Sequence, residues 1–350
     1  MNILLFQMAM FFTAAAFSQA APIGAFEAVF RLPTDNQALL EGHPEEFYMY
    51  VHRLFEGKRT KEWTGGQYGF VRTPIRFSTG VYCTKFHEGL DIRPVKRDAR
   101  GEPLDEVRPM APGVVVHVSE DPRKSNYGRY VVVEHELPEG KIYSLYAHMA
   151  SVSCKTGQRV GTGNRLGVMG HSGVGLDRER SHVHVELCLL MNRRFQEHYD
   201  GMKIAAPNAH GIYNGLNLVG FDASAVLLAC REGRAFSLKQ HFSGLEEQYR
   251  VRVPFSGAMP DILLRHPFLW NDPDQIKHPA SLDISFTGAG LPFRITPSKE
   301  AVPAPRVVAA KPWPFDQKFR TLSRVTGSSK EPVLTNSGKN HINLLMLGAQ

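Results

Sequence analysis

The sequence predicts a mainly β protein built around a small antiparallel β domain over residues 70–200. Short runs rich in Val, Ile and Tyr recur there between Gly, Pro and Asn residues, which is typical of strands joined by turns. The 350 residues and a hydrophobic fraction of 43% suffice for a real core and for more than one domain. We therefore expect an N-terminal arm over residues 21–69 and a mixed α/β extension after the central domain.

The first twenty residues are typical of a secretory signal peptide. An uncharged apolar run from Ile3 to Phe17 is followed by Ser18-Gln19-Ala20, with small residues where a signal peptidase reads them. Cleavage after Ala20 would make the protein secreted, or periplasmic in the cell envelope. Because no Lys or Arg precedes the apolar run, an uncleaved N-terminal anchor is the alternative. No later stretch has the roughly 18 to 20 apolar residues of a membrane-spanning helix, so we expect no stable membrane span after cleavage.

In the N-terminal arm we expect one helix over residues 44–55. The apolar residues of this stretch recur at the spacing of one broad helical face. The Gly- and Thr-rich segment near Thr64 indicates turns. The arm contains no catalytic motif, so we expect it to pack on the domain that follows.

The central domain is expected to contain a clear antiparallel hairpin. Two runs of alternating Val, Ile and Tyr flank the loop at residues 137–141 and place His148 at a strand end. The glycines between Gly157 and Gly175 indicate tight turns, because neither a phosphate-binding motif nor a following helix is present. The expected strands of the domain are 113–118, 130–136, 141–147, 166–169 and 182–190.

The C-terminal part carries no motif that indicates a function. Residues 201–295 form an extension of unknown role, with a helix expected over residues 238–250 from its apolar spacing. Residues 296–350 are expected to be a Pro-rich linker and tail. Within them, residues 296–314 suggest an extended linker or surface wrap, and residues 323–350 a poorly ordered end.

Charge and cysteine content narrow the classes of partner. The formal net charge of +7 favours anionic partners, which for an exported protein means the cell wall or a lipid surface. No nucleic-acid motif is present, and we expect no nucleic-acid partner. The four cysteines include no C-x-x-C pair, which argues against a zinc knuckle or a redox motif. One disulfide and buried reduced thiols remain equal alternatives.

A strand with two histidines is the strongest chemical signal in the sequence. In His182-Val183-His184-Val185-Glu186 the side chains alternate, so His182, His184 and Glu186 project from one face. His87 and Asp91, four residues apart, would complete a three-ligand zinc site with one of these imidazoles, leaving a position open for water. His148 and the other strand histidine could then act as general base and as donor to an oxyanion.

These segments, taken in order, resemble the lysostaphin-type (LytM-type) zinc endopeptidases over residues 70–191. The motifs that carry the resemblance are Phe86–Asp91, Pro112–Val115, Tyr127–His135, Leu145–Met149, Val160–Gly173 and His182–Glu186. The resemblance implies a small antiparallel β peptidase domain of the duplicated hybrid motif type. It implies Zn²⁺ as cofactor and hydrolysis of amide bonds in the peptide cross-links of peptidoglycan, an anionic cell-wall partner.

The resemblance also distributes roles among the site residues. His87, Asp91 and His184 match the zinc ligands of the family. His148 and His182 match its two histidines that flank the water and the scissile carbonyl without binding the metal. Glu186 is expected to support a ligand, and Cys188 lies next on the same face.

One departure from the family affects the expected groove. The family has Gly-Pro before the H-x-H pair, whereas Asp177-Arg178-Glu179-Arg180-Ser181 stands here and changes a groove-lining loop. Two alternatives therefore stay open. The first is a non-catalytic module that binds the wall or regulates another wall hydrolase, although such relatives typically lose zinc ligands. The second is an enzyme that acts on a Gly-rich protein or bacteriocin target. The sequence predicts neither the oligomeric state nor the bond that is cleaved.

Overall fold

A seven-stranded antiparallel sheet forms the centre of the molecule. The computed structural model describes residues 29–272 and 276–348, so the expected signal peptide lies outside the described residues. The strand order is β11-β7-β8-β9-β13-β14, with β5 paired to the other end of β13. The expected central strands are confirmed, as is the mainly β fold. The bounds are β5 Leu90–Ile92, β7 Gly113–Ser119, β8 Tyr130–Leu137, β9 Gly140–Ala147, β11 Arg159–Val160, β13 Val183–Leu190 and β14 Leu218–Phe221.

Strand β13 connects this sheet to the site. It lies between β9 on one side and β5 and β14 on the other, and every one of its residues is buried. Val183, Val185 and Leu187 enter the main hydrophobic core, so the side chains that alternate with them point to the opposite face. A small sheet flanks the domain in the order β10-β12-β6, formed by β6 Glu106–Val107, β10 Ser151–Val152 and β12 Gly167–Val168.

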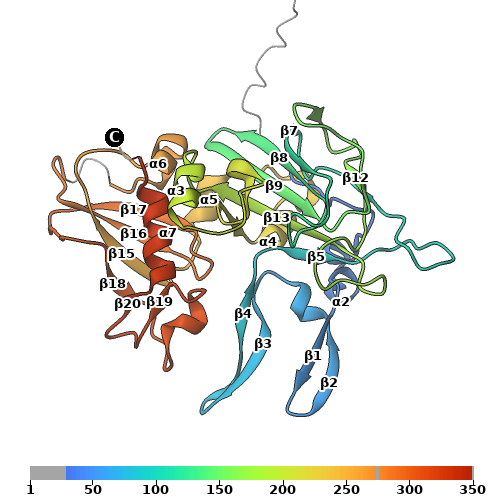
Figure 1. The fold of residues 1–350 in the computed structure, drawn as a ribbon, viewed down its shortest axis with the longest axis horizontal. Coiled ribbons are helices and arrows are strands. Elements are labelled where there is room, and N and C mark those ends of the chain that lie inside the picture. The colour runs from blue at the N-terminus through green and yellow to red at the C-terminus, as the bar shows by residue number, and fades with distance from the viewer. Residues whose placement is uncertain (1–28, 273–275, 349–350) are drawn as a thin grey trace, which may run out of the picture.

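Two β hairpins project side by side from the central domain (Figure 1). The first consists of β1 Val51–Phe55 and β2 Lys58–Glu62, and the second of β3 Gly69–Phe77 and β4 Gly80–His87. The expected helix over residues 44–55 is therefore wrong. Helix α2 ends at Phe47, because the next apolar residues pair across a turn in which Glu56 and Gly57 have positive φ values of 50° and 77°. The remaining elements of the arm are α1 Ala38–Glu41, α2 Pro44–Phe47 and the 3₁₀ turn η1 Trp63–Gly66.

The C-terminal half forms a second antiparallel sheet in the order β17-β16-β15-β18. Its strands are β15 Tyr249–Pro254, β16 Ser281–Phe286, β17 Pro292–Ser298 and β18 Arg306–Ala310. The expected helix over residues 238–250 is wrong in its second half. Helix α5 ends at Ser243 before Gly244, and the alternating burial of Tyr249, Val251 and Val253 places that stretch in a strand.

The expected linker and poorly ordered tail are structured. Strand β18 lies within residues 296–314 and pairs with β15, so the Pro-rich segment contributes a sheet edge. Helix α7 begins after Thr335, whose side chain accepts a hydrogen bond from the Gly338 amide, and it buries Ile342 and Leu345. The other elements here are α3 Phe195–Gly201, α4 Ala223–Ala229, α5 Leu238–Ser243, α6 Asp261–Arg265, α7 Asn336–Met346, β19 Val325–Thr326, β20 Val333–Leu334, and the 3₁₀ turns η2 Gly211–Tyr213, η3 Arg231–Gly233, η4 Pro267–Leu269 and η5 Gln317–Arg320.

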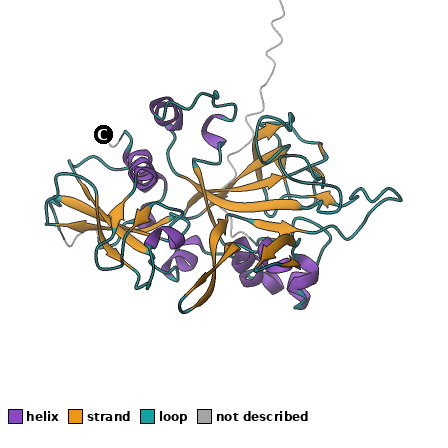
Figure 2. Ribbon diagram, turned by 60° about the horizontal axis from the view of Figure 1, so that its bottom comes forward, coloured by secondary structure: helices purple, strands orange, loops and turns teal. Residues whose placement is uncertain are grey.

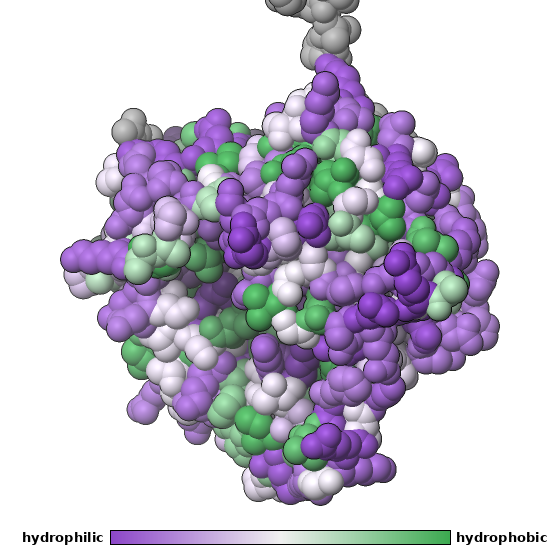
Figure 3. All heavy atoms as spheres, turned by 45° about the vertical axis from the view of Figure 1, so that its right-hand side comes forward, coloured by the Kyte–Doolittle hydropathy of each residue, from purple (hydrophilic) through white to green (hydrophobic). Residues whose placement is uncertain are grey.

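Strands dominate both halves of the molecule, and the helices are short (Figure 2). Hydrophilic residues cover most of the face in Figure 3, with hydrophobic residues interspersed among them. Among the described residues, none of the helices has the length and apolar character needed to cross a membrane. All four cysteines are free thiols, so the disulfide alternative is not the one found in the structure.

Candidate metal centre

Three side chains from two distant segments converge where β5 pairs with β13. His184 lies opposite Asp91 in the β5–β13 register, and His87 ends β4 just before the turn into β5. Gly89 makes this approach feasible, because a Cβ atom there would lie 2.4 Å from the Val185 carbonyl oxygen and 2.9 Å from the His184 ring. All three side chains are buried.

The ligand atoms form a compact triangle. His87 Nε2 lies 3.1 Å from His184 Nδ1 and 3.1 Å from Asp91 Oδ1, and His184 Nδ1 lies 2.9 Å from the same oxygen. A point about 2.1 Å from all three atoms exists for a triangle of this size, which matches zinc–nitrogen and zinc–oxygen distances. The three residues are also the one metal-binding group of His, Cys, Asp or Glu found among the described residues.

Hydrogen bonds on the far side of each imidazole set its tautomer. His87 Nδ1 donates to the Gln67 carbonyl oxygen at 2.8 Å, and His184 Nε2 donates to Glu186 Oε1 at 2.8 Å. In the neutral rings, the nitrogens that face the centre therefore carry lone pairs. Two nitrogens and a carboxylate oxygen this close need a positive charge among them, which either a proton on His184 or a metal ion supplies. This donor set suits zinc, and each histidine has the outer partner that metal-ligating histidines usually have.

The electrostatics of the centre favour a positive charge. Burial disfavours a charged His184, but hydrogen bonds to Asp91 and Glu186 outweigh that effect and raise the pKa of His184 to about 10. Burial would also raise the pKa of Asp91, yet the imidazoles of His182 and His87 hold it well below its ordinary value. Asp91 is thus a carboxylate that a cation can approach. Burial, the largest effect, lowers the pKa of His87 although the nearby Asp91 carboxylate raises it.

A second layer of residues holds the ligands in place. Arg72 Nη2 donates to Asp91 Oδ2 at 2.5 Å, which leaves Oδ1 facing the histidines. Tyr127 donates its hydroxyl proton to Glu186 Oε1 at 2.7 Å, and the Cys188 thiol donates to Oε2 at 3.2 Å. Glu186 therefore accepts three hydrogen bonds. The expected supporting contact of Glu186 is present, and Cys188 contributes to the same network.

His148 and His182 lie beside the three ligands without joining them. Their ring centroids are 4.9 Å apart, and the His148 ring lies 5.8 Å from that of His184. His148 Nδ1 donates to the Ser172 carbonyl oxygen at 2.9 Å, and His182 Nδ1 donates to that of Arg180 at 2.7 Å. Neither Nε2 atom has a backbone partner among the described residues, but that of His182 lies 3.3 Å from Asp91 Oδ1.

The backbone of His148 is unusual. Its φ of 62° lies in the left-handed region, which a residue with a side chain seldom adopts. The His148 amide donates to the Tyr127 carbonyl oxygen at 2.8 Å, which holds this conformation. Burial, together with the neighbouring His182 and His184, keeps the pKa of His148 well below its ordinary value. His148 is thus neutral at physiological pH.

All five predicted site residues line one cavity of about 430 Å³. Three further lining residues, Arg72, Tyr127 and Arg180, were not predicted as site residues. Tyr127 belongs to one of the motifs shared with the lysostaphin-type peptidases. Its hydrogen bond to Glu186 joins residues 59 positions apart, and no sequence pattern predicts a contact over that distance. Arg72 lies in β3, at the start of the expected peptidase domain, where the sequence indicated neither a strand nor a site residue, so it offers no signal for the contact with Asp91.

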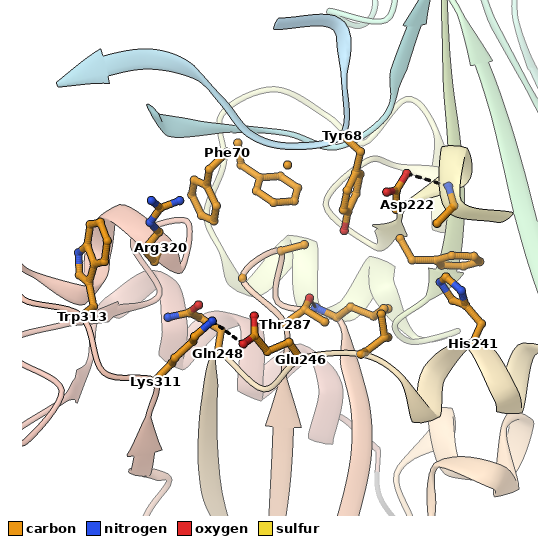
Figure 4. A pocket seen from close by; sticks show the side chains of 18 of the residues that line it. Tyr68, Phe70, Asp222, His241, Glu246, Gln248, Thr287, Lys311, Trp313 and Arg320 are labelled. Atoms are coloured by element: carbon orange, nitrogen blue, oxygen red, sulfur yellow. Dashed lines mark hydrogen bonds and ion pairs between the residues drawn. The ribbon is translucent and has the colours of Figure 1, made fainter. Parts of the chain in front are cut away.

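A larger cavity of about 610 Å³ lies between the β3–β4 hairpin and the C-terminal half (Figure 4). Aromatic side chains, including Tyr68, Phe70 and Trp313, line it together with polar ones such as Gln248 and Arg320. Phe86 borders both cavities. None of the five predicted site residues lines the larger cavity, so its size does not mark the chemistry.

Residues 85–196 match the model of Peptidase family M23. This segment contains the convergent ligands together with His148 and His182, and it lies within the mainly β domain described above. The fold and the family match define a metallopeptidase-family domain. The resemblance to the lysostaphin-type peptidases is thereby confirmed for this part of the chain.

Comparison with solved structures gives relatives of the same kind. The catalytic domain of the prophage-encoded M23 protein EnpA from Enterococcus faecalis is 24% identical with a TM-score of 0.25, covering 35% of this chain and 75% of that one. A zinc-containing peptidase from Vibrio cholerae is 23% identical with a TM-score of 0.26, covering 41% and 36%. The catalytic domain of lysostaphin from Staphylococcus simulans is 19% identical with a TM-score of 0.25, covering 36% and 82%. No curated protein matches the chain.

Proposed function

We propose that the chain is an exported zinc metalloendopeptidase that hydrolyses amide bonds in the peptide cross-links of peptidoglycan. The observation that carries the proposal is the convergence of His87, Asp91 and His184 at the floor of a cavity, with their outer hydrogen bonds already made. The family match over the same residues supports the reaction class. The net charge of +7 suits an anionic wall.

His87 Nε2, Asp91 Oδ1 and His184 Nδ1 would hold the zinc ion. When bound, zinc lowers the pKa of a coordinated water towards neutrality and polarises the carbonyl of the bond to be cleaved. Glu186 and the Gln67 carbonyl keep the two ligand rings in the required tautomer. Arg72 holds Asp91 Oδ2, which turns Oδ1 towards the centre.

The two remaining histidines move the protons. The Nδ1–H groups of His148 and His182 are committed to backbone oxygens, so the Nε2 atoms are the atoms available for proton transfer. One of them takes the proton of the attacking water and later passes it to the leaving amine. The other, once protonated, donates to the oxygen that gains negative charge.

Mass analysis of digested wall tests this proposal. Purified peptidoglycan is incubated with the zinc-loaded protein and with protein treated with a chelator. We expect the zinc-loaded protein, but not the chelator-treated protein, to release new amino groups and peptide fragments. The summed mass of the two fragments should exceed that of the intact cross-link by one water. Zinc-loaded protein that binds the wall without releasing fragments would overturn the proposal and favour the non-catalytic module.

A further inference from the structure

Two cationic side chains that line the catalytic cavity, Lys85 and Arg180, form no ion pair among the described residues. The cationic side chains of the cavity are Arg72, Lys85 and Arg180. Of its three carboxylates, Asp91 pairs with Arg72 and Glu186 is hydrogen-bonded to His184, which leaves Glu88 beside Lys85 and Arg180. A second cavity of about 320 Å³ between the two hairpins shares Arg72 and Lys85 with the catalytic one. Arg72 and Lys85 thus lie on the wall between the two cavities.

Lys85 lies where another positive charge opposes it. It lies directly opposite Arg72 in the β3–β4 register, next to a bulge between Phe70 and Arg72. Like charges facing each other across strands destabilise a sheet. The Arg72 charge is offset by Asp91, but no carboxylate of the described residues forms an ion pair with Lys85. Lys85 is exposed and stands two residues before His87, so its side chain leaves β4 on the same face as that ligand.

Arg180 reaches the cavity from the loop that replaces the family's Gly-Pro. Its neighbours in the loop are tied down: Glu179 accepts hydrogen bonds from Tyr50 and Lys61, each at 2.6 Å, and Arg178 pairs with Glu102 at 2.8 Å. The Arg180 amide donates to Asp177 Oδ1 at 2.9 Å, but its guanidinium makes only a 3.4 Å contact from Nε to the Tyr50 carbonyl oxygen and forms no ion pair with a carboxylate of residues 29–272 and 276–348. The loop is thus held in place by Arg178 and Glu179, while the positive charge of Arg180, which lines the cavity, is not neutralised by an ion pair among the described residues.

We propose that Lys85 and Arg180 form a carboxylate-binding subsite at the mouth of the catalytic cavity, which selects peptides with a free carboxyl group close to the amide that is cleaved. Lys85 stands two residues before His87 and Arg180 two residues before His182, and both line the same cavity. Paired cationic donors bind a carboxylate more strongly than neutral donors do. The inference rests on the proposed endopeptidase function and adds its substrate class.

Amidation of the wall tests the subsite. One batch of peptidoglycan keeps its carboxyl groups, and a second has them converted to amides by carbodiimide coupling with ammonia. We expect the zinc-loaded wild-type protein to cleave the acidic wall with a kcat/KM about tenfold higher, since charge-assisted hydrogen bonds to the carboxylate are lost on amidation. In Lys85→Met/Arg180→Met this preference disappears. Lys58→Met, which removes a hairpin cation outside both cavities, retains it.

Equal cleavage of both walls by the wild-type protein would overturn the subsite while leaving the proposed function intact. If neither wall is cleaved, the proposed function fails, and a binding measurement decides the subsite by itself. In that measurement, calorimetric titration compares soluble wall peptides in acid and amide form. Tighter binding of the acid form by the wild-type protein, but not by the double variant, supports the subsite, and equal binding overturns it. Peptides amidated at the side chain alone or at the C-terminus alone identify which carboxyl group is read.

Discussion

Glu186 shows how a residue outside the metal centre controls it. Its carboxylate accepts a hydrogen bond from His184 Nε2, so that Nδ1 is the atom that would bind the metal in the proposed centre. We expect Glu186→Gln to weaken zinc binding by roughly 10- to 100-fold, as is usual when the outer partner of a ligand histidine is changed. Competition against a chromogenic chelator measures the effect.

A matched control is Glu197→Gln, which removes an exposed carboxylate paired with Arg194 and should leave zinc affinity unchanged. Equal zinc affinity of Glu186→Gln and the wild-type protein would contradict the role assigned to Glu186. Burial of Glu186 against Tyr127 and Cys188 is a further reason to verify folding of the variant by circular dichroism.

At the level of single residues, the sequence predicted the convergent set but not its surroundings. Period-2 alternation places His182, His184 and Glu186 on one face, and this follows from strand geometry alone. The catalytic and metal-binding roles of the five site residues stay predictions until measured. Arg72, by contrast, meets Asp91 across a hairpin whose position depends on tertiary packing, which no local pattern encodes.

Among the secondary-structure elements, helix α7 departs most from expectation. Its polar composition suggested a loose tail, but Ile342 and Leu345 are buried, and Asn192 donates to the carbonyl oxygens of Leu344 and Leu347. The sequence signal is weak because only one side of the helix is apolar and the partner residue lies far away in the chain. A pattern of so few apolar residues does not reveal where they pack.

Leu345→Ala tests whether α7 belongs to the core. Leu345 is completely buried, so removing its side chain should lower the free energy of unfolding by about 2 to 5 kcal/mol. Asn343→Ala changes an exposed residue of the same helix and should alter it by less than about 0.5 kcal/mol. Denaturant unfolding measures both variants. Similar stability of the two would mean that α7 contributes no core contact.

Two segments that were expected to be helical contain a strand in their second half. In residues 44–55 and 238–250 the apolar residues satisfy a helical spacing, yet tertiary partners draw their second halves into β1 and β15. A short apolar run fits either period, and the partner strand decides. The central strands lack this ambiguity, because glycines and prolines delimit them and their alternation is regular.

For the molecule as a whole, buried histidines predict a loss of stability in acid. Burial lowers the pKa of His135 to about 4, and burial together with the charge of Arg265 lowers that of His266 to about 3. In the unfolded chain both pKa values return to about 6.5. The unfolded state therefore binds more protons in this range, so stability is full above about pH 6.5 and falls as the pH drops towards 4.

Unfolding in urea at about pH 7.5 and about pH 5 measures this effect. Each histidine should account for roughly 2 kcal/mol of the difference in unfolding free energy between these pH values. His135→Gln should reduce the difference by about that amount, whatever its own stability at the higher pH. An unchanged difference in His135→Gln would show that His135 does not carry the expected pH dependence.

His184 is proposed to bind zinc, and His148 to transfer protons without binding it. Measurements of zinc content and of wall hydrolysis test these two roles together. Both are measured in parallel on the wild-type protein, His184→Ala and His148→Ala. We expect one zinc per wild-type chain, loss of zinc and activity together in His184→Ala, and retained zinc with a roughly 10²- to 10⁴-fold lower rate in His148→Ala. Wild-type rates of wall cleavage by His184→Ala would contradict the assignment of the metal centre.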